Sequence, residues 1–334
     1  MDSLATVAFA RALVDIDSTT GREHAAGAWL ADTLSGLGYT VRTLPVERGC
    51  FNVLATLDEP SVVFSTHFDC VPPFIPSRVA DGRLYGRGAC DAKGILAAQV
   101  AAAERLRGKG ETRIGLVFVG GEERGSDGAK AANRIASKSR FLINGEPTES
   151  RLASGAKGSL RVTVKTRGRE AHSAYPHLGR SAIEPMLELL PTIRSLDLPT
   201  DPVLGETTVN IGTIRGGTEA NIIPGECEAE LMFRLVGDVA RVKAMIEQWA
   251  GDRAEIDYGS YIPAQHFHVV SGFDVAPVAY TSDIPLLGRW GTPLMFGPGS
   301  IHVAHTPNEY IDVRELRESV TTYERLVRSL LTSA

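Results

Sequence analysis

The sequence predicts an α/β fold in which a mostly parallel mixed sheet is flanked by helices and interrupted by an inserted α+β domain of the split βαβ (ferredoxin-like) type. Helices and apolar strands alternate over residues 1–156, a β-α-β-β-α-β order occupies residues 157–266, and the first pattern returns over residues 267–334. Alternating helices and strands are typical of a parallel sheet covered on both faces. The middle order is that of a split βαβ unit.

The first part of the chain supplies most of the expected sheet. Thr20 and Glu23 have the spacing of a capping box, which predicts a helix running toward Gly36 and Gly38. Strands are expected over residues 39–44, 51–57, 61–66, 112–119 and 141–144, and the nearly all-apolar ones suit a buried central position. Further helices are expected over residues 92–107, whose small apolar face would lie flat on the sheet, and over residues 126–138.

The inserted part and the return to the first pattern follow. In the inserted part, half-buried strands are expected over residues 159–168, 207–217, 226–235 and 253–260, with helices over residues 180–196 and 239–250. After the insertion we expect an apolar helix near residues 275–289, a strand over 292–296 and a helix over 313–332.

Composition excludes several classes of protein. With 43% hydrophobic and 22% charged residues, the 334-residue chain can bury a core. A net charge of -5 gives no reason to expect nucleic acid or an anionic membrane as partner. No apolar run is long enough for a membrane span, and the first 17 residues have the pattern of a helix rather than a signal peptide. Four cysteines without a CxxC pair suit a reducing compartment, so we expect a cytoplasmic protein.

Groups that can bind a metal follow four apolar runs, and another precedes the alanine-rich helix. In chain order they are His67 with Asp69, Asp91, Glu122 with Glu123, Glu146, and His305. Each alone has an ordinary interpretation: a surface pair, a helix N-cap or a solvated loop. Open α/β sheets, however, bind ligands outside the carboxyl ends of their strands. Together the residues therefore predict a two-metal hydrolase.

The residue types fit zinc chemistry. Zinc takes imidazole nitrogen and carboxylate oxygen, and a catalytic site keeps one position open for water. Of His67 and Asp69, one can bind metal while the other orients it. Of Glu122 and Glu123, one can bind metal while its neighbour takes a proton from water. Asp91 can bridge two cations with its two oxygens.

Seven segments between residues 65 and 311 carry a family resemblance: STHFDCVP, GRLYGRGACDAKG, GGEERGSDGA, NGEPT, AHSAYPHLGRSAI, ANIIPGE and GPGSIHVAHTPNEYI. They resemble the dinuclear zinc metallohydrolases that include acetylornithine deacetylases, succinyl-diaminopimelate desuccinylases, aminoacylases and glutamate carboxypeptidases. The resemblance implies a zinc-exopeptidase-like catalytic domain formed by residues 1–156 and 267–334. It also implies two zinc ions, which cobalt could replace.

The resemblance assigns a role to each strand-end residue. One zinc would be held by His67, Asp91 and Glu146, and the other by Asp91, Glu123 and His305. Asp69 would orient His67. Glu122 would be the general base that takes a proton from the attacking water and passes it to the leaving amine.

The resemblance also implies roles outside the metal site. The inserted residues 157–266 would mediate homodimerisation, and His172 would act on the tetrahedral oxyanion in the partner subunit's active site. Asn221, Arg234 and Gly299 match substrate-binding positions, and Arg234 suits a bidentate grip on an α-carboxylate.

The implied substrate is an N-acyl amino acid. The segment GPGSIHVAHTPNEYI most resembles acetylornithine deacetylases, which implies hydrolysis of N-acetylornithine, or of an analogue such as acetylcitrulline or an acyl-lysine, in arginine or lysine biosynthesis. The alternatives are a dipeptidase or carboxypeptidase, or a succinyl-diaminopimelate desuccinylase, of the same family. A non-catalytic amino-acid-binding homologue would lack a ligand or the base, whereas this chain has all of them.

Overall fold

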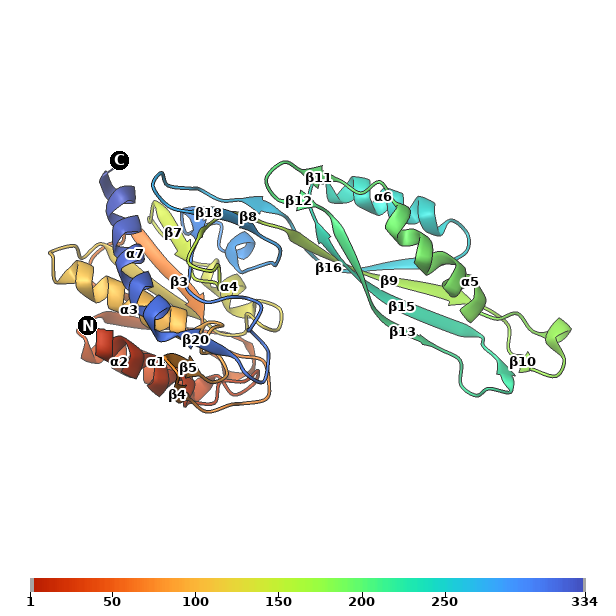
Figure 1. Ribbon diagram of the computed structural model, residues 1–334, viewed down its shortest axis with the longest axis horizontal. Coiled ribbons are helices and arrows are strands. Elements are labelled where there is room, and N and C mark those ends of the chain that lie inside the picture. Colours follow the sequence, from red (N-terminus) through yellow and green to blue (C-terminus); the bar gives the residue numbers. More distant parts are fainter. Residues whose placement is uncertain (1–2, 333–334) are drawn as a thin grey trace. The chain divides into compact units, whose positions relative to one another are not determined.

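The computed structural model describes residues 3–332 and contains two compact units (Figure 1). The first unit contains the chain up to Ser154, Phe267–Ala276 and the chain from Ser282 onward. The second unit contains Gly155–His266 and Pro277–Thr281.

The first unit is built on a six-stranded mixed sheet, as predicted. Its strands, in spatial order, are β1 (Thr40–Pro45), β2 (Phe51–Thr56), β6 (Ile114–Val119), β3 (Val62–His67), β7 (Phe141–Asn144) and β19 (Thr292–Met295). The last four run parallel to one another, whereas β2 is antiparallel to both β1 and β6. Four neighbouring strands therefore end at the same edge of the sheet.

Helices cover both faces of this sheet because its central strands are apolar on both sides. Phe64 packs into one core with α1 (Ser3–Val14), α2 (His24–Gly36), α3 (Lys93–Arg107) and α7 (Val313–Thr332). The preceding residue, Val63, packs on the opposite face of the sheet with α4 (Asp127–Ala132) and Trp290. None of the described helices has the length and hydropathy needed to cross a bilayer.

The chain also forms two small three-stranded sheets, one within the first unit and one with strands from both units. One has the order β20 (Tyr310–Asp312), β5 (Arg83–Tyr85) and β4 (Arg78–Ala80). The other has the order β17 (Gln265–His266), β8 (Leu152–Ala156) and β18 (Val275–Val278).

The second unit has the expected split βαβ order. Its elements are β9 (Gly158–Arg167), α5 (Ile183–Leu189), β13 (Thr208–Gly216), β15 (Glu226–Leu235), α6 (Val239–Ala250) and β16 (Glu255–Ile262). The sheet order is β13-β15-β9-β16, with every pair antiparallel. Alternate residues of β15, from Cys227 to Leu235, are buried in a core with both helices. The remaining residues of β15 point to the other face of the sheet.

The helix predicted near residues 275–289 is wrong. This stretch instead forms β18 and the short 3-10 helix η4 (Ile284–Leu286). Pro277 and Pro285 explain the difference, since proline lacks the backbone N–H that a helix interior requires.

Three other helices differ in detail. The predicted capping box does not form: α2 begins at His24, and the Glu23 carboxylate accepts a hydrogen bond from the Gly21 N–H at 2.7 Å. Helix α4 ends at Ala132, short of the predicted residue 138. Helix α5 passes at Leu190 into the 3-10 helix η3 (Leu190–Ser195).

We predict that Tyr323→Phe destabilises the first unit by about 1–2 kcal/mol. Tyr323 is fully buried on α7, and its hydroxyl donates to the Phe296 carbonyl at 2.5 Å, so the variant leaves that carbonyl without its donor. Urea unfolding followed by circular dichroism measures the change. Tyr258→Phe, on a partly exposed tyrosine of β16, is the control. An effect of Tyr323→Phe no larger than the control's would contradict the prediction.

Candidate metal centre

The parallel strands bring the predicted metal-binding residues of the first unit to one edge of the sheet. His67 is the last residue of β3, and the pair Glu122–Glu123 follows β6 after two glycines. Glu146 follows β7, and His305 lies in the loop after β19. Asp91 lies two residues before the alanine-rich helix α3. Residues that lie up to 238 positions apart in the sequence therefore meet at one place.

Asp91 lies between two imidazoles. The Nε2 atom of His67 is 2.9 Å from Asp91 Oδ1, and the Nε2 atom of His305 is 3.2 Å from Asp91 Oδ2. The same nitrogen of His305 is 2.9 Å from Glu123 Oε1. Each oxygen of one buried carboxylate thus faces a different histidine, which is the arrangement expected of a carboxylate that bridges two cations.

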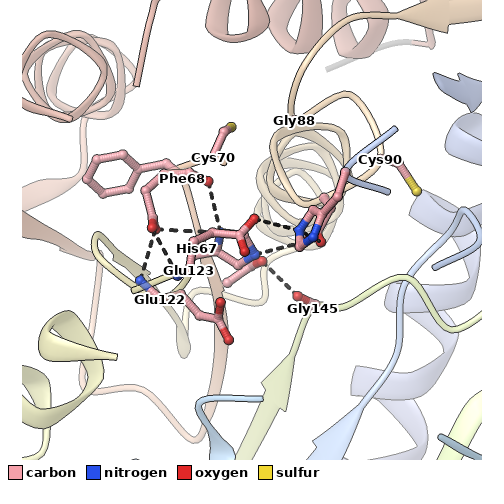
Figure 2. A network of polar contacts seen from close by, with 12 residues as sticks. His67, Phe68, Cys70, Gly88, Cys90, Glu122, Glu123 and Gly145 are labelled. Carbon is pink, nitrogen blue, oxygen red and sulfur yellow. Dashed lines mark hydrogen bonds and ion pairs between the residues drawn. The ribbon is translucent and has the colours of Figure 1, made fainter. Parts of the chain in front are cut away.

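Asp69 orients both the His67 ring and the turn that carries Glu122 and Glu123. The Nδ1 atom of His67 is 3.0 Å from the Asp69 carbonyl oxygen and 3.6 Å from its Oδ1 atom, which leaves Nε2 facing Asp91. The two carboxylate oxygens of Asp69 also accept hydrogen bonds from the backbone N–H groups of Glu122 and Glu123, each at 3.1 Å. Figure 2 shows both glutamates beside His67. One fully buried acid therefore fixes the histidine ring and the turn that carries both glutamates.

Asn52 fixes the start of the turn that carries Glu122 and Glu123. The Asn52 side chain accepts from the Gly120 N–H at 3.2 Å and donates to the Gly128 carbonyl at 2.7 Å. A Cβ atom on Gly128 would lie 2.2 Å from the Gly120 carbonyl oxygen, so the turn closes only with glycine there. Sequence reasoning did not single out Asn52.

Glu146 is held by the backbone before it. The Gly145 N–H donates to the Ser65 carbonyl at 2.7 Å, and the Thr66 hydroxyl donates to the Gly145 carbonyl at 2.7 Å. The Glu146 side chain is buried, yet its Oε1 atom accepts no hydrogen bond from the described residues. A buried carboxylate oxygen without a partner is costly unless a cation binds it.

The electrostatics of the site show an excess of carboxylates. Burial and neighbouring acids raise the pKa values of Glu122 and Glu146 well above the usual range. Burial opposes ionisation of Asp91, but the hydrogen bonds with His305 and His67 outweigh it and lower the pKa of Asp91. Hydrogen bonds to Asp91 and Glu123 raise the pKa of His305 to about 10. Positive charge is therefore favoured at this site.

The residues fit a metal. Ligand atoms of His67, Asp91 and Glu123 all lie within 4.8 Å of one another. His305 extends this group through Asp91 and Glu123, and the free oxygen of Glu146 adds a further donor. Imidazole nitrogens with carboxylate oxygens are a donor set that zinc and similar divalent cations use.

Two further acids near the site were not identified from the sequence. Asp283 is buried at the start of η4, and its carboxylate oxygens accept no hydrogen bond of good geometry from the described residues. Burial raises its pKa to about 6, and its charge raises the pKa of Glu122. Glu309 is buried beneath the Asp91 turn and accepts from its backbone. Glu309 lies inside a family-like segment, but nothing in that segment marks it as buried.

Both backbone polar groups of Gly299, a predicted substrate contact, form hydrogen bonds within the protein. Its N–H donates to Glu315 at 2.8 Å, and its carbonyl accepts from the Glu149 N–H at 2.8 Å. Its φ of +87° is a conformation that favours glycine, and a Cβ atom would lie 2.6 Å from Cys90 Sγ. These contacts favour a role in packing the loop.

The other predicted substrate residues lie in the second unit. His172 is exposed in β10 (Ala171–His172), which pairs with β14 (Ile222–Ile223), and the Ser173 N–H donates to the Asn221 carbonyl at 2.9 Å. His172 and Asn221 are therefore neighbours. Arg234 is half-buried near the other end of β15. The metal-site residues, by contrast, all belong to the first unit.

Comparisons with known proteins agree with this geometry. A peptidase M20 domain-containing protein of Schizosaccharomyces pombe is 37% identical, over 95% of this chain and 82% of that protein. A probable carboxypeptidase of Neosartorya fischeri is 38% identical, over 97% of this chain and 86% of that protein.

Solved structures share the fold. A tripeptidase from Staphylococcus aureus has a TM-score of 0.83 at 22% identity, covering 98% of this chain and 99% of that one. A metallo-carboxypeptidase of the M20 family from Sulfolobus solfataricus has a TM-score of 0.78 at 20% identity, covering 98% and 99%. A Bacillus subtilis protein described as a dinuclear metal binding peptidase from the M20 family has a TM-score of 0.72 at 15% identity, covering 96% of both chains.

The family assignment rests on the sequence match. The model of peptidase family M20/M25/M40 matches residues 63–329, which contain all the predicted metal ligands. The chain therefore belongs to peptidase family M20/M25/M40 and is an enzyme of the M20 metallopeptidase family.

Proposed function

We propose that the protein is a two-metal peptidase that hydrolyses the amide bond next to a free C-terminal carboxylate, as a carboxypeptidase or dipeptidase does. The observation that carries the proposal is the position of Asp91, whose two oxygens face His67 and His305. The names of relatives support the peptidase activity: one at 38% identity is called a probable carboxypeptidase. Arg234 of the second unit, which forms no ion pair with any acid among the described residues, supports the free carboxylate.

Each cation has three protein ligands in this proposal. His67, Asp91 and Glu146 hold one, and Asp91, Glu123 and His305 hold the other. Zinc suits these donors, and cobalt, which accepts similar ligands, is a suitable replacement. The two cations would polarise the scissile carbonyl and lower the pKa of the attacking water.

Glu122 moves the proton. Its backbone N–H is held by Asp69, and its neighbour Glu123 is held by the other oxygen of the same acid. One glutamate of the pair can thus act as a ligand while the Glu122 carboxylate accepts a proton from water and returns it to the leaving amine.

The hydrogen bonding of His172 leaves one ring nitrogen as a hydrogen-bond donor. The Ala174 N–H donates to His172 Nδ1 at 3.1 Å, so a neutral His172 carries its proton on Nε2. We propose that this exposed Nε2–H group stabilises the oxyanion of the tetrahedral intermediate.

Arg234 is suited to bind the substrate carboxylate. It lies on the face of β15 that points away from the core, and burial lowers the pKa of its guanidinium. No acid among residues 3–332 forms an ion pair with it. A partly desolvated guanidinium without a partner binds a planar carboxylate strongly through two parallel hydrogen bonds.

The positions of His172 and Arg234 within the second unit support a homodimer. Arg167, at the end of β9 nearest His172, pairs with Glu226, and Arg234 lies eight positions after Glu226 along β15. This separation is about 27 Å for an extended strand. Figure 1 shows β10 at the tip of the second unit, beyond β15. Both residues can serve one substrate if His172 comes from a partner subunit, with residues 157–266 as the dimerisation part.

Deacylation of N-acetylornithine or a close analogue is the second candidate. The segment GPGSIHVAHTPNEYI supports it, and the amino-acid carboxylate of such a substrate would also suit Arg234. The peptidase names of the relatives favour the first candidate.

The function and the role of Arg234 can be tested together. We expect the cobalt- or zinc-loaded protein to cleave dipeptides and short peptides faster than their C-terminal amides and faster than N-acetylornithine. Arg234→Gln should raise KM for peptides with a free carboxylate about 10- to 100-fold, because a charged hydrogen-bonded pair of roughly 1.5–3 kcal/mol is lost. The measurement is a steady-state assay of released amine.

Peptide amides are the matched control for Arg234. Their KM should change little in Arg234→Gln, since they lack the carboxylate. Faster hydrolysis of N-acetylornithine than of any peptide would favour the second candidate. No hydrolysis of any of these amides would contradict both.

We predict that Glu122→Gln lowers kcat by about 10²- to 10⁴-fold, the usual range for loss of a general base. The amide keeps the shape of the side chain but accepts no proton at neutral pH. Metal content, measured by inductively coupled plasma mass spectrometry, should equal that of the wild type. Full activity, or loss of metal in parallel with activity, would refute the assignment of Glu122 as the base.

Co-expression of two inactive variants tests whether His172 acts in the partner subunit. A hybrid dimer of Glu122→Gln and His172→Ala chains has one active site with both Glu122 and His172 intact. Random pairing should therefore restore about a quarter of the wild-type activity. Each variant expressed alone is the control. Size-exclusion chromatography with light scattering checks the dimer, and a mixture no more active than its components would show that His172 does not act in trans.

A further inference from the structure

The buried acid Glu309 binds the turn that carries Asp91. Its Oε1 atom accepts hydrogen bonds from the backbone N–H groups of Gly88 at 2.9 Å, Cys90 at 3.1 Å and Asp91 at 3.1 Å. The side chain is 1% exposed, so none of these bonds competes with bulk water. Three amides of one turn converging on one carboxylate oxygen fix the backbone from which the Asp91 side chain extends. Figure 2 shows Gly88 and Cys90, the other two residues of this contact, close to the metal-binding residues.

The other oxygen of Glu309 is bound by Arg87, which is also buried. Arg87 Nη1 lies 2.6 Å from Glu309 Oε2 and also donates to the Thr306 carbonyl at 3.2 Å. Arg87 Nε donates to the Pro73 carbonyl at 3.3 Å. The ion pair has all its main hydrogen-bonding partners inside the protein, and it leaves no charge of the pair unmatched.

This ion pair connects the two chain segments that meet at the Asp91 carboxylate. Glu309 lies four residues after His305, and Arg87 lies four residues before Asp91. The Gly86 N–H also donates to the Glu309 carbonyl at 3.1 Å. The 3.2 Å separation of His305 Nε2 and Asp91 Oδ2 is thus set by two backbone segments that Glu309 ties together.

We propose that Glu309 is a positioning residue that holds Asp91 against His305, and that it sets the affinity of the cation site formed by Asp91, Glu123 and His305. The proposal rests on the assignment of metal ligands under the proposed function. Outer residues that orient a metal's ligands typically contribute 10- to 100-fold in affinity.

The other cation site should depend less on Glu309. Two of its ligands, His67 and Glu146, are placed by β3 and by the backbone after β7, through contacts with Asp69, Ser65 and Thr66. None of those contacts involves Glu309. Loosening the Asp91 turn therefore displaces one of the three ligands of this site. At the site with His305 it also changes the distance between two of the three ligands, Asp91 and His305.

The test measures metal binding rather than turnover alone. Apo protein is titrated with Zn²⁺ or Co²⁺ by isothermal calorimetry, and bound metal is counted by mass spectrometry. We expect the wild type to bind two cations. Glu309→Gln should bind the cation of the Asp91, Glu123 and His305 site about 10- to 100-fold more weakly, and the other cation with a clearly smaller loss of affinity. Excess Co²⁺ should then restore most of its turnover, as expected of a positioning residue.

A second variant guards against misfolding. Glu309→Gln leaves the buried Arg87 unpaired, which can destabilise the fold. The double variant Arg87→Gln with Glu309→Gln leaves no charge unpaired, and it should show the same selective loss at one site. Glu324→Gln is the matched control, because Glu324 is also a buried acid of the first unit. It lies on α7 and forms ion pairs with Lys109 and with Arg328. This control variant should bind both cations as the wild type does.

The outcomes separate the two proposals. Unchanged affinity for both cations in the folded Glu309 variants would overturn the role of Glu309 and leave the proposed function intact. An equal loss at both sites would also overturn it, since that is the result of general loosening. A wild-type protein that binds no pair of cations would overturn the proposed function and this inference with it.

Discussion

The candidate metal centre depends on one contact, the Asp91 carboxylate between His67 and His305. Its two oxygens must meet imidazoles from the end of a central strand and from a loop more than 200 residues later. Parallel strands bring those ends to one edge of the sheet. Buried anchors, Asp69 and Glu309, then fix the separate turns that carry the ligands. Each anchor acts through backbone amides, which a side-chain substitution elsewhere cannot easily replace.

The concentration of carboxylates explains why such anchoring is necessary. Burial and mutual repulsion raise the pKa values of Glu122, Glu146 and Asp283, so the protein alone does not favour their ionised forms together. Ligation requires deprotonated groups, so a cation that bound here would release protons and stabilise the ionised carboxylates. Buried anchors hold these acids close together through the backbone: Asp69 accepts from the Glu122 and Glu123 N–H groups, and Glu309 accepts from that of Asp91.

The sequence predicted the elements that have a strong period or a long apolar run. The central strands and helices α3, α6 and α7 were predicted to within a few residues, because burial on one or both faces determines their pattern. The stretch near residues 275–289 was mistaken for a helix, since its apolar content outweighed the effect of two prolines in the prediction.

Of the candidate site, the gathering of the strand-end acids and histidines could be predicted because a buried strand followed by an acid or histidine is a local pattern. Asn52, Asp283 and Glu309 could not be. Asn52 fixes a turn at Gly120, and Glu309 fixes one at Asp91, so each acts on backbone far away in the sequence. No short segment contains both partners of such a contact. Their roles appear only once the fold brings the partners together.

The residues proposed to hold metal and the residues proposed to bind substrate belong to different units. Every proposed ligand, the proposed base and both anchors lie in the first unit, whereas His172, Asn221 and Arg234 lie in the second. Under the proposed function, substitutions in β15 change which substrate is bound without altering the cation sites. Structures with this fold include a tripeptidase and a metallo-carboxypeptidase. Fold alone does not determine the substrate, so the substrate of this enzyme has to be inferred from residues such as Arg234 rather than from the metal centre.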